Sequence, residues 1–130
     1  MRTRLVIVRK SRFVVELLSE DGLERFDAAI GANPDGRDKA AEGDCRTPEG
    51  VFAVSSIEDS SEWEHEGREA YGPHFLRLSC PPWQGIGIHG TDEPALLGTR
   101  SSLGCVRMRN DDLEKLVGSV EVGTLVIIAP

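Results

Sequence analysis

The chain has 130 residues, of which 39% are hydrophobic and 28% are charged, a composition typical of one soluble domain that is large enough to bury a core. Twenty-two acidic residues against fifteen lysines and arginines give a net charge of -7. This charge argues against nucleic acid or an anionic membrane as the main partner, because both require a basic protein surface.

Short β-branched runs separated by turns predict strands in the first part of the chain. Residues 4–8 and 12–18 flank a polar turn and predict a β-hairpin. An Asp-Gly turn follows, and residues 23–31 predict a third strand. Residues 32–50 contain Asn-Pro, Asp-Gly and Thr-Pro pairs, which are typical of a loop. Residues 51–57 predict a fourth strand.

An acidic segment and two further strands are expected in the middle of the chain. Residues 58–72 carry six acidic residues against one arginine, and they are expected to form a short helix, a mobile flap or simply a solvated face. Residues 74–80 and 85–90 predict two strands around the turn PPWQ.

One helix is predicted near the C-terminus. In the segment NDDLEKLVG, Asn110 is expected to act as the N-cap, two aspartates suit the first turn, and Gly118 supplies a stop. The segment GTLVIIAP predicts a closing strand. Together these elements predict a mainly β fold over residues 1–130, a single-domain, β-sandwich-like structure with one short helix.

The N-terminal segment MRTRLVIVRK does not have the pattern of a signal peptide. Its apolar run covers only residues 5–8, and no small-residue cleavage site follows. No apolar stretch approaches the length that is needed to span a membrane. We therefore expect either a cytoplasmic protein or a chain whose leader is missing.

The segment IGIHGTDEPALLGTRSSLGCVRM is the strongest candidate for a catalytic site. A cysteine nucleophile needs a base, and His89 can act as one and lower the thiol pKa of Cys105. Gly104 allows the backbone to approach a substrate closely, and the amides around the cysteine can form an oxyanion hole. If the segment is extended, Arg107 points to the same side as Cys105.

Three arginines near the cysteine suggest a locally basic site on an acidic protein. Arg100, Arg107 and Arg109 are expected either to bind a ligand carboxylate or to be ordinary solvated side chains. The three cysteines allow at most one internal disulfide, so at least one thiol stays free.

From spacing alone, two other interpretations compete with catalysis. The histidine and the cysteine can be simple core or surface residues, or they can join two further residues in a zinc site, made of His74, Cys80, His89 and Cys105. None of the spacings gives the close ligand pair that structural zinc sites favour. The sequence has no GxSxG elbow, phosphate loop or dinucleotide fingerprint.

The motif IHGT followed by SLGCVRM resembles the L,D-transpeptidase catalytic domain, the YkuD domain of bacterial cell-wall synthesis. Upstream, EGDCRTPEGVF resembles the Thr-Pro-x-Gly segment of that family and the strand after it. Downstream, RMRNDDLEKL and VGTLVIIAP resemble its helix and its last strand. The resemblance extends from about the first strand to the end of the chain.

The resemblance implies a β-rich fold with the cysteine and the histidine at one end. Cys105 would attack a peptide carbonyl of a peptidoglycan stem, form a thioester and release a terminal D-alanine. His89 would activate the thiol and later take a proton from the incoming amine. The backbone carbonyl that orients the imidazole in this family corresponds to Gly90.

The resemblance also assigns roles around the nucleophile. Ser102 and Gly104 match small positions that shape the catalytic loop, and Arg107 matches an arginine that holds the loop or a substrate carboxylate. Many members have histidine at the position of Leu103, so oxyanion stabilisation here would depend on backbone amides. Cys45 matches no catalytic position and is expected to be a small side chain in a turn.

The implied partners are peptidoglycan stem peptides, one as donor and one as acceptor through the side-chain amine of a diamino acid. The resemblance implies no cofactor and no metal. It implies an extracytoplasmic location, in the periplasm or the cell wall, reached after trimming of a leader or by an unusual route. The alternatives are an L,D-carboxypeptidase or amidase with the same nucleophile, and a non-catalytic cell-wall-binding domain.

Overall fold

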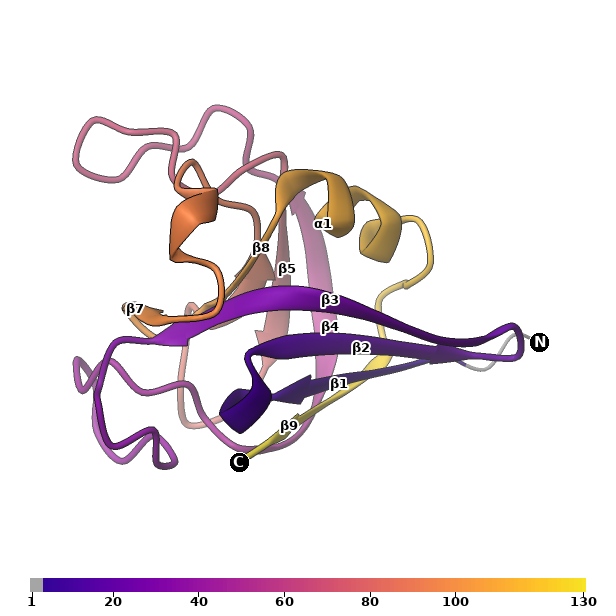
Figure 1. Ribbon diagram of the computed structural model, residues 1–130, viewed down its shortest axis with the longest axis horizontal. Coiled ribbons are helices and arrows are strands. Elements are labelled where there is room, and N and C mark those ends of the chain that lie inside the picture. The colour runs from indigo at the N-terminus through magenta and orange to yellow at the C-terminus, as the bar shows by residue number, and fades with distance from the viewer. Residues whose placement is uncertain (1–3) are drawn as a thin grey trace.

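The first strands follow the β-branched runs of the sequence. The computed structural model describes residues 4–130, so the first three residues of the segment MRTRLVIVRK lie outside the described residues (Figure 1). The hairpin that the sequence predicts is confirmed: β1 (Leu5–Arg9) and β2 (Val14–Ser19) are antiparallel and are joined by the 3-10 turn η1 (Lys10–Arg12). β3 (Gly22–Gly31) pairs with β2 after the expected Asp-Gly turn.

The remaining strands are β4 (Gly50–Asp59), β5 (His74–Ser79), β6 (Gly87–His89), β7 (Arg100–Ser102), β8 (Val106–Met108) and β9 (Leu125–Ala129). Four of them lie close to their predicted positions, whereas β7 and β8, on either side of Cys105, were not predicted from the sequence. Alternate burial is clear in β8 and β9, while all three residues of β6 are buried. A second 3-10 turn, η2 (Pro94–Leu96), lies between β6 and β7.

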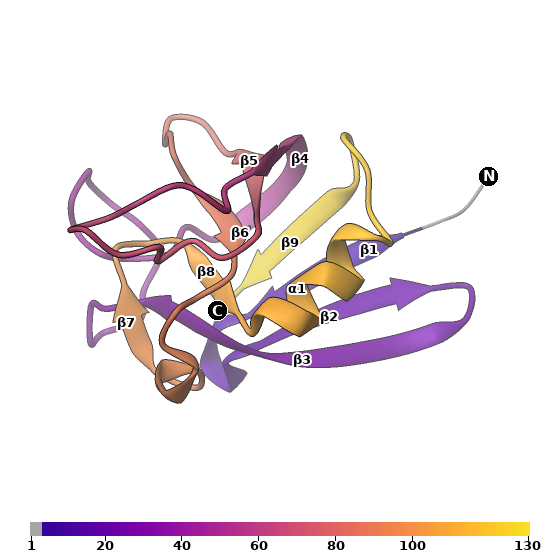
Figure 2. The same cartoon turned by 90° about the horizontal axis from the view of Figure 1, so that it is seen from above.

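The sheet closes on itself. Its strand order is β2-β1-β9-β4-β5-β6-β8-β3-β7, and β2 also pairs with β3, which closes the first eight strands of this series into a barrel-like ring and leaves β7 attached outside it to β3. The expectation of a mainly β, sandwich-like fold with one α-helix is confirmed, since opposite walls of this ring face each other across a shared core (Figures 1 and 2).

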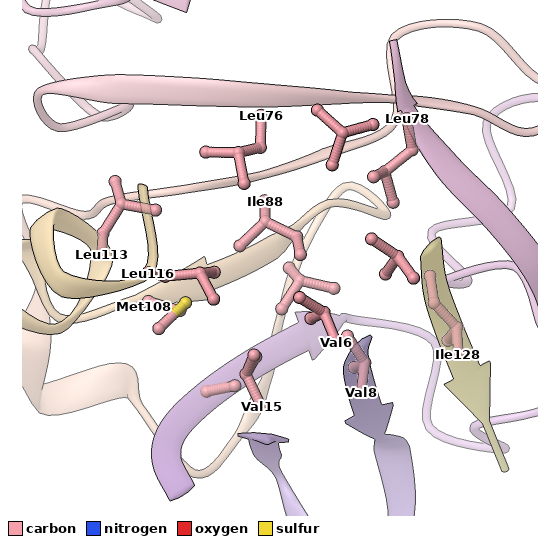
Figure 3. Packing of buried hydrophobic residues seen from close by; sticks show 14 of the residues in the cluster. Val6, Val8, Val15, Leu76, Leu78, Ile88, Met108, Leu113, Leu116 and Ile128 are labelled. Carbon is pink, nitrogen blue, oxygen red and sulfur yellow. The ribbon is translucent and has the colours of Figure 1, made fainter. Parts of the chain in front are cut away.

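The core lies between the two walls. Figure 3 shows Leu113 and Leu116 entering it from α1 (Asn110–Val117), between Leu76 on one wall and Val15 on the other. All four side chains are completely buried. The expected apolar face of this helix therefore attaches it to the sheet.

The predicted N-cap of α1 is wrong. Asn110 is the first helical residue, and Arg109 occupies the cap position without a side-chain hydrogen bond. The Asn110 side chain is engaged elsewhere, because its Oδ1 accepts a hydrogen bond of 2.9 Å from the amide of Thr91. The predicted stop at Gly118 is confirmed.

The acidic segment forms a flap and contains no helix. Its first two residues end β4, and the rest, residues 60–73, is an irregular loop that we call the β4–β5 flap. In Figures 1 and 2 this flap passes over the region of β6 and β8. Arg68 ties it to the loop after β6 through ion pairs with Asp92 and Glu93. Among the described residues, no helix combines the length and the apolar character that crossing a lipid bilayer requires.

Candidate active site

The register of two neighbouring strands puts the main candidates on one face of the sheet. β6 and β8 are parallel, with Ile88 opposite Val106 and His89 opposite Arg107. Ile88 and Val106 are fully buried in the core. Because side chains alternate along a strand, His89, Arg107 and Cys105 point to the other face.

These three residues line one cavity of about 510 Å³. Its floor is formed by β5, β6 and the segment before β8, and the flap contributes Trp63, His65 and Tyr71 to its wall. Leu103 stands at its rim with 65% of its surface exposed. The cavity has the size and the mixed lining that are typical of a small-molecule or peptide site.

His89 is held in a defined orientation and tautomer. Its ring stacks on Phe75 at 5.5 Å between centroids and lies 5.0 Å from the ring of Tyr71. Nδ1 lies 2.7 Å from the carbonyl oxygen of Gly90, as the resemblance implied. A carbonyl only accepts, so Nδ1 carries the proton and Nε2 of the neutral ring is left as an acceptor.

The pKa values of the pair favour neutral groups at rest. Burial lowers the pKa of His89 to about 4. The hydrogen bond to the Gly90 carbonyl opposes this shift, whereas the nearby positive charge of Arg107 adds to it. Burial raises the pKa of the Cys105 thiol, although the Gly87 amide and Arg107 partly oppose this effect. The structure thus gives no lowering of this thiol pKa by an imidazolium, because burial keeps His89 neutral and raises the pKa of the thiol.

At rest the thiol of Cys105 has a hydrogen-bond partner other than the imidazole. Cys105 Sγ donates to the carbonyl oxygen of Gly85 at 3.3 Å, and no hydrogen bond joins it to His89 in the part of the chain that the structure describes. The two side chains share the cavity, so the close approach that the sequence predicts stays a prediction for the substrate-bound enzyme.

A serine and a threonine hold the loop that carries the nucleophile. The Ser102 hydroxyl donates to the carbonyl oxygen of Cys105 at 2.5 Å and accepts from the amide of Gly104 at 3.1 Å. The Thr47 hydroxyl donates to the carbonyl oxygen of Gly104 at 2.8 Å and accepts from the amide of Gly31 at 2.9 Å. Gly104 has a φ of 144°, which explains the need for glycine beside the cysteine.

A buried lysine supports the threonine. Lys10 is 2% exposed, and its Nζ donates to the carbonyl oxygens of Thr47 at 2.6 Å and Arg37 at 2.9 Å and pairs with Glu49 at 3.1 Å. Sequence reasoning missed both Lys10 and Thr47 as parts of the site. The Thr-Pro motif was a signal for Thr47, whereas the sequence has no comparable signal for Lys10.

Only one of the three clustered arginines lines the cavity. Arg107 does, and its Nε is buried with no hydrogen-bond partner among the described residues. Arg100 instead lies over the ring of Phe13 at 5.1 Å, and Arg109 pairs with Asp27 at 3.6 Å. Of the two interpretations, the structure supports exposed side chains with partners outside the cavity for Arg100 and Arg109.

A different arginine, which sequence reasoning missed, takes part in the site. Arg77 of β5 lines the cavity and is held by Glu58 through hydrogen bonds of 2.6 and 3.2 Å. Its guanidinium lies 4.9 Å from the centre of the Phe75 ring. Strand alternation placed Arg77 and Phe75 on one face, but nothing in the sequence showed which face meets the cavity.

Close backbone contact fixes the root of the flap beside the histidine. The Gly90 amide donates to the Tyr71 carbonyl at 2.8 Å, and Gly72 packs against Gly90. A side chain at either glycine would collide with the Asn110 amide oxygen. Asn110 thus belongs to the support of His89 and not to the cap of its own helix.

The four residues of the zinc alternative do not assemble. His74 pairs with Glu114 at 2.9 Å, and the buried Cys80 thiol donates to the carbonyl of Leu78 at 3.8 Å. Within residues 4–130, no three histidine, cysteine or acidic side chains are grouped as metal ligands. All three cysteines are free, and Cys45 lies in a turn with a φ of 56°.

Comparison with known proteins gives a consistent family match. The family model for the L,D-transpeptidase catalytic domain (YkuD) matches residues 3–128. A putative L,D-transpeptidase, YkuD of Bacillus licheniformis, is 35% identical over 85 residues, which are 65% of this chain and 46% of that protein. YqjB of Bacillus subtilis, another putative L,D-transpeptidase, is 31% identical over 90 residues, 63% of this chain and 51% of that protein. The chain spans about half the length of these curated relatives.

Solved structures share the fold at low sequence identity. An L,D-transpeptidase from Mycobacterium smegmatis superposes with a TM-score of 0.76 at 18% identity, covering 99% of this chain and 59% of that one. The helical cell shape determining protein Pgp2 from Campylobacter jejuni superposes with a TM-score of 0.73 at 23% identity, covering 98% of this chain and 47% of that one. At these identities the likeness supports the fold.

Proposed function

Because the chain belongs to the L,D-transpeptidase catalytic domain family, we propose that residues 1–130 act as one such domain and cross-link peptidoglycan stem peptides through a thioester on Cys105. The observation that carries this proposal is the shared cavity of Cys105, His89 and Arg107. In it, the Gly90 carbonyl holds Nδ1 and leaves Nε2 as the acceptor for a thiol proton.

The first half of the reaction acylates the cysteine. The Cys105 side chain turns from the Gly85 carbonyl towards His89, and Nε2 takes the thiol proton while sulfur attacks the scissile carbonyl. Since both groups are neutral at rest, the proton moves during the attack. The C–N bond then breaks, and the imidazolium returns the proton to the amine of the departing D-alanine. The low pKa of His89 favours this return.

The oxyanion of the tetrahedral intermediate needs donors from the backbone. The Gly104 amide is bonded to Ser102, so we assign this role to the amides of Leu103 and Cys105. Leu103 itself points to solvent and supplies no polar side chain. Ser102 and Thr47 keep the loop in the shape that directs these amides.

The second half of the reaction transfers the acyl group. An acceptor amine attacks the thioester carbonyl and His89 takes the amine proton. The C–S bond then breaks, and His89 passes that proton to the sulfur, which regenerates the thiol. Arg107, with its unpartnered Nε, binds a carboxylate of the donor. Cross-linking of peptidoglycan takes place outside the cytoplasm, and we propose that the protein acts there.

The test is incubation with stem tetrapeptides followed by mass spectrometry. We expect a cross-linked dimer, which Cys105→Ala abolishes and Cys45→Ala, the matched control, retains. A shortened tripeptide without dimer would identify a carboxypeptidase that uses the same acyl-enzyme. If neither product forms and Cys105 carries no acyl group, the domain is a binding module and the proposal fails.

A further inference from the structure

Arg77 lies across the floor of the cavity from the nucleophile. In the pairing of β5 with β6, Arg77 is opposite Gly87. In the pairing of β6 with β8, Ile88 is opposite Val106, which puts Cys105 beside Gly87. Since neighbouring strands are about 4.8 Å apart, the α-carbons of Arg77 and Cys105 are about 10 Å apart. The Phe75 ring covers the glycine between them, because a Cβ at Gly87 would lie 2.5 Å from a carbon of that ring, so this ring is the floor between the two residues.

The guanidinium of Arg77 is fixed before any ligand binds. Glu58 accepts hydrogen bonds from Nε and Nη2 of Arg77, and the Ser56 hydroxyl in turn donates to Glu58 at 2.7 Å. The Phe75 ring supports the guanidinium from one side. Glu58 uses two of about five N–H donors, so the others are free to meet a ligand in the cavity. A preorganised guanidinium loses little freedom when it binds a carboxylate.

The nucleophile therefore lies between two guanidinium groups. Arg107 lies two residues along the strand from Cys105, and Arg77 lies two strands away across the floor. Glu64 is the one carboxylate among the residues that line the cavity, and Glu58, which does not line it, already pairs with Arg77. The cavity therefore has no excess of positive charge, and what it offers a ligand is two sets of guanidinium N–H donors, one on each side of Cys105.

We propose that Arg77 is a specificity-determining residue that binds a donor carboxylate preceding the scissile bond, while Arg107 binds the carboxylate of the leaving residue. With the scissile carbonyl at Sγ and the terminal carboxylate at Arg107, the preceding residues of the donor pass over the Phe75 ring, which covers Gly87, towards Arg77. This inference rests on the proposed function and deepens it. The preferred substrates are stem peptides with free carboxylates on both sides of the cleaved bond.

The test compares two peptides on one protein. One is a stem tetrapeptide with its upstream carboxylates free, and the other carries carboxamides there, with the terminal carboxylate free in both. Titration calorimetry on Cys105→Ala measures binding without turnover. We expect the acid form to bind about tenfold more tightly, because a charge-assisted hydrogen bond is lost in the amide. Arg77→Gln in the same background should remove this preference, and Arg77→Lys should restore part of it.

The control is Arg109→Gln, which removes the same charge outside the cavity and should keep the preference. Since each result is a ratio of two affinities on one protein, general effects on folding or on the thiol cancel. An unchanged ratio in Arg77→Gln, no preference in the parent, or no binding of either peptide overturns the inference. Acylation is measured separately, by intact mass of the protein with Cys105 present. Acylation there with an unchanged affinity ratio refutes this inference alone, whereas charge-dependent binding without any acylation refutes the proposed function.

Discussion

Replacing Thr47 with valine removes the hydroxyl that fastens the cysteine loop while it preserves the shape of the side chain. Thr47 is 1% exposed and bonds the Gly104 carbonyl at 2.8 Å and the Gly31 amide at 2.9 Å. Valine makes neither bond, so the buried Gly104 carbonyl and the buried Gly31 amide both lose the Thr47 hydroxyl as a partner. Each such loss costs about 1–3 kcal/mol, and we expect the free energy of unfolding to fall by about 2–5 kcal/mol.

Urea denaturation measures this loss, and the rate at which a β-lactam acylates Cys105 measures its effect on the site. We expect acylation to slow roughly tenfold or more in Thr47→Val, because Gly104 and the amides beside it are no longer held in place. Thr47→Ser keeps the hydroxyl and is the matched control, with a rate close to that of the wild type. A Thr47→Val protein with unchanged stability and an unchanged acylation rate would refute the assignment of Thr47 to the support of the loop.

Four further predictions concern the cavity. Arg107→Ala should slow turnover of carboxylate-bearing donors roughly ten- to hundredfold in steady-state kinetics, since a hydrogen bond worth about 1.5–3 kcal/mol is lost; an unchanged rate would assign Arg107 to the surface. Replacing Cys45 and Cys80 with alanine should leave activity within a few-fold, because neither lines the cavity; a folded but inactive double variant would mean that the nucleophile is misassigned. A carbapenem-type β-lactam should add to Cys105 alone, as shown by intact mass and peptide mapping, and His89→Ala should abolish the adduct; equal labelling of all three thiols would contradict an activated site. The pKa of His89 is lowered from 6.5 to about 4, so between these pH values the folded protein binds fewer protons at this residue than the unfolded chain. The free energy of unfolding is therefore full above about pH 6.5 and falls by up to about 3 kcal/mol as the pH approaches 4. Urea titrations at both pH values should show a smaller fall in His89→Gln.

Local patterns in the sequence were sufficient to locate most of the strands and the candidate His–Cys pair, but not the three-residue strands β7 and β8. The β-branched runs gave strands near their observed bounds, because alternate burial is a local property of a strand. The motif around His89 and Cys105 identified two residues that do line one cavity. Periodicity also predicted the position of α1. It did not predict the role of Asn110, because that side chain bonds a partner nineteen residues away in the chain.

The support of the site depends on contacts between distant parts of the chain, which a local pattern does not contain. Thr47 is 57 residues from Gly104, and Lys10 is 37 residues from Thr47. Arg77 could be assigned to the site only once it was known which face of the sheet lies under the flap. The raised thiol pKa of Cys105 follows from burial, which is known only once the flap and the strands are in place.

The tight contact between Gly72 and Gly90 has a consequence for engineering the enzyme. It anchors one end of the β4–β5 flap beside His89, while the other end continues from β4, so the intervening residues form a cassette between two fixed joints. Tyr71, next to the anchored end, packs on the His89 ring at 5.0 Å, so an exchanged cassette has to keep this residue. The segment between β4 and Tyr71 is then the part of the cavity wall that can be varied in length and composition while the strands that carry His89 and Cys105 stay unchanged.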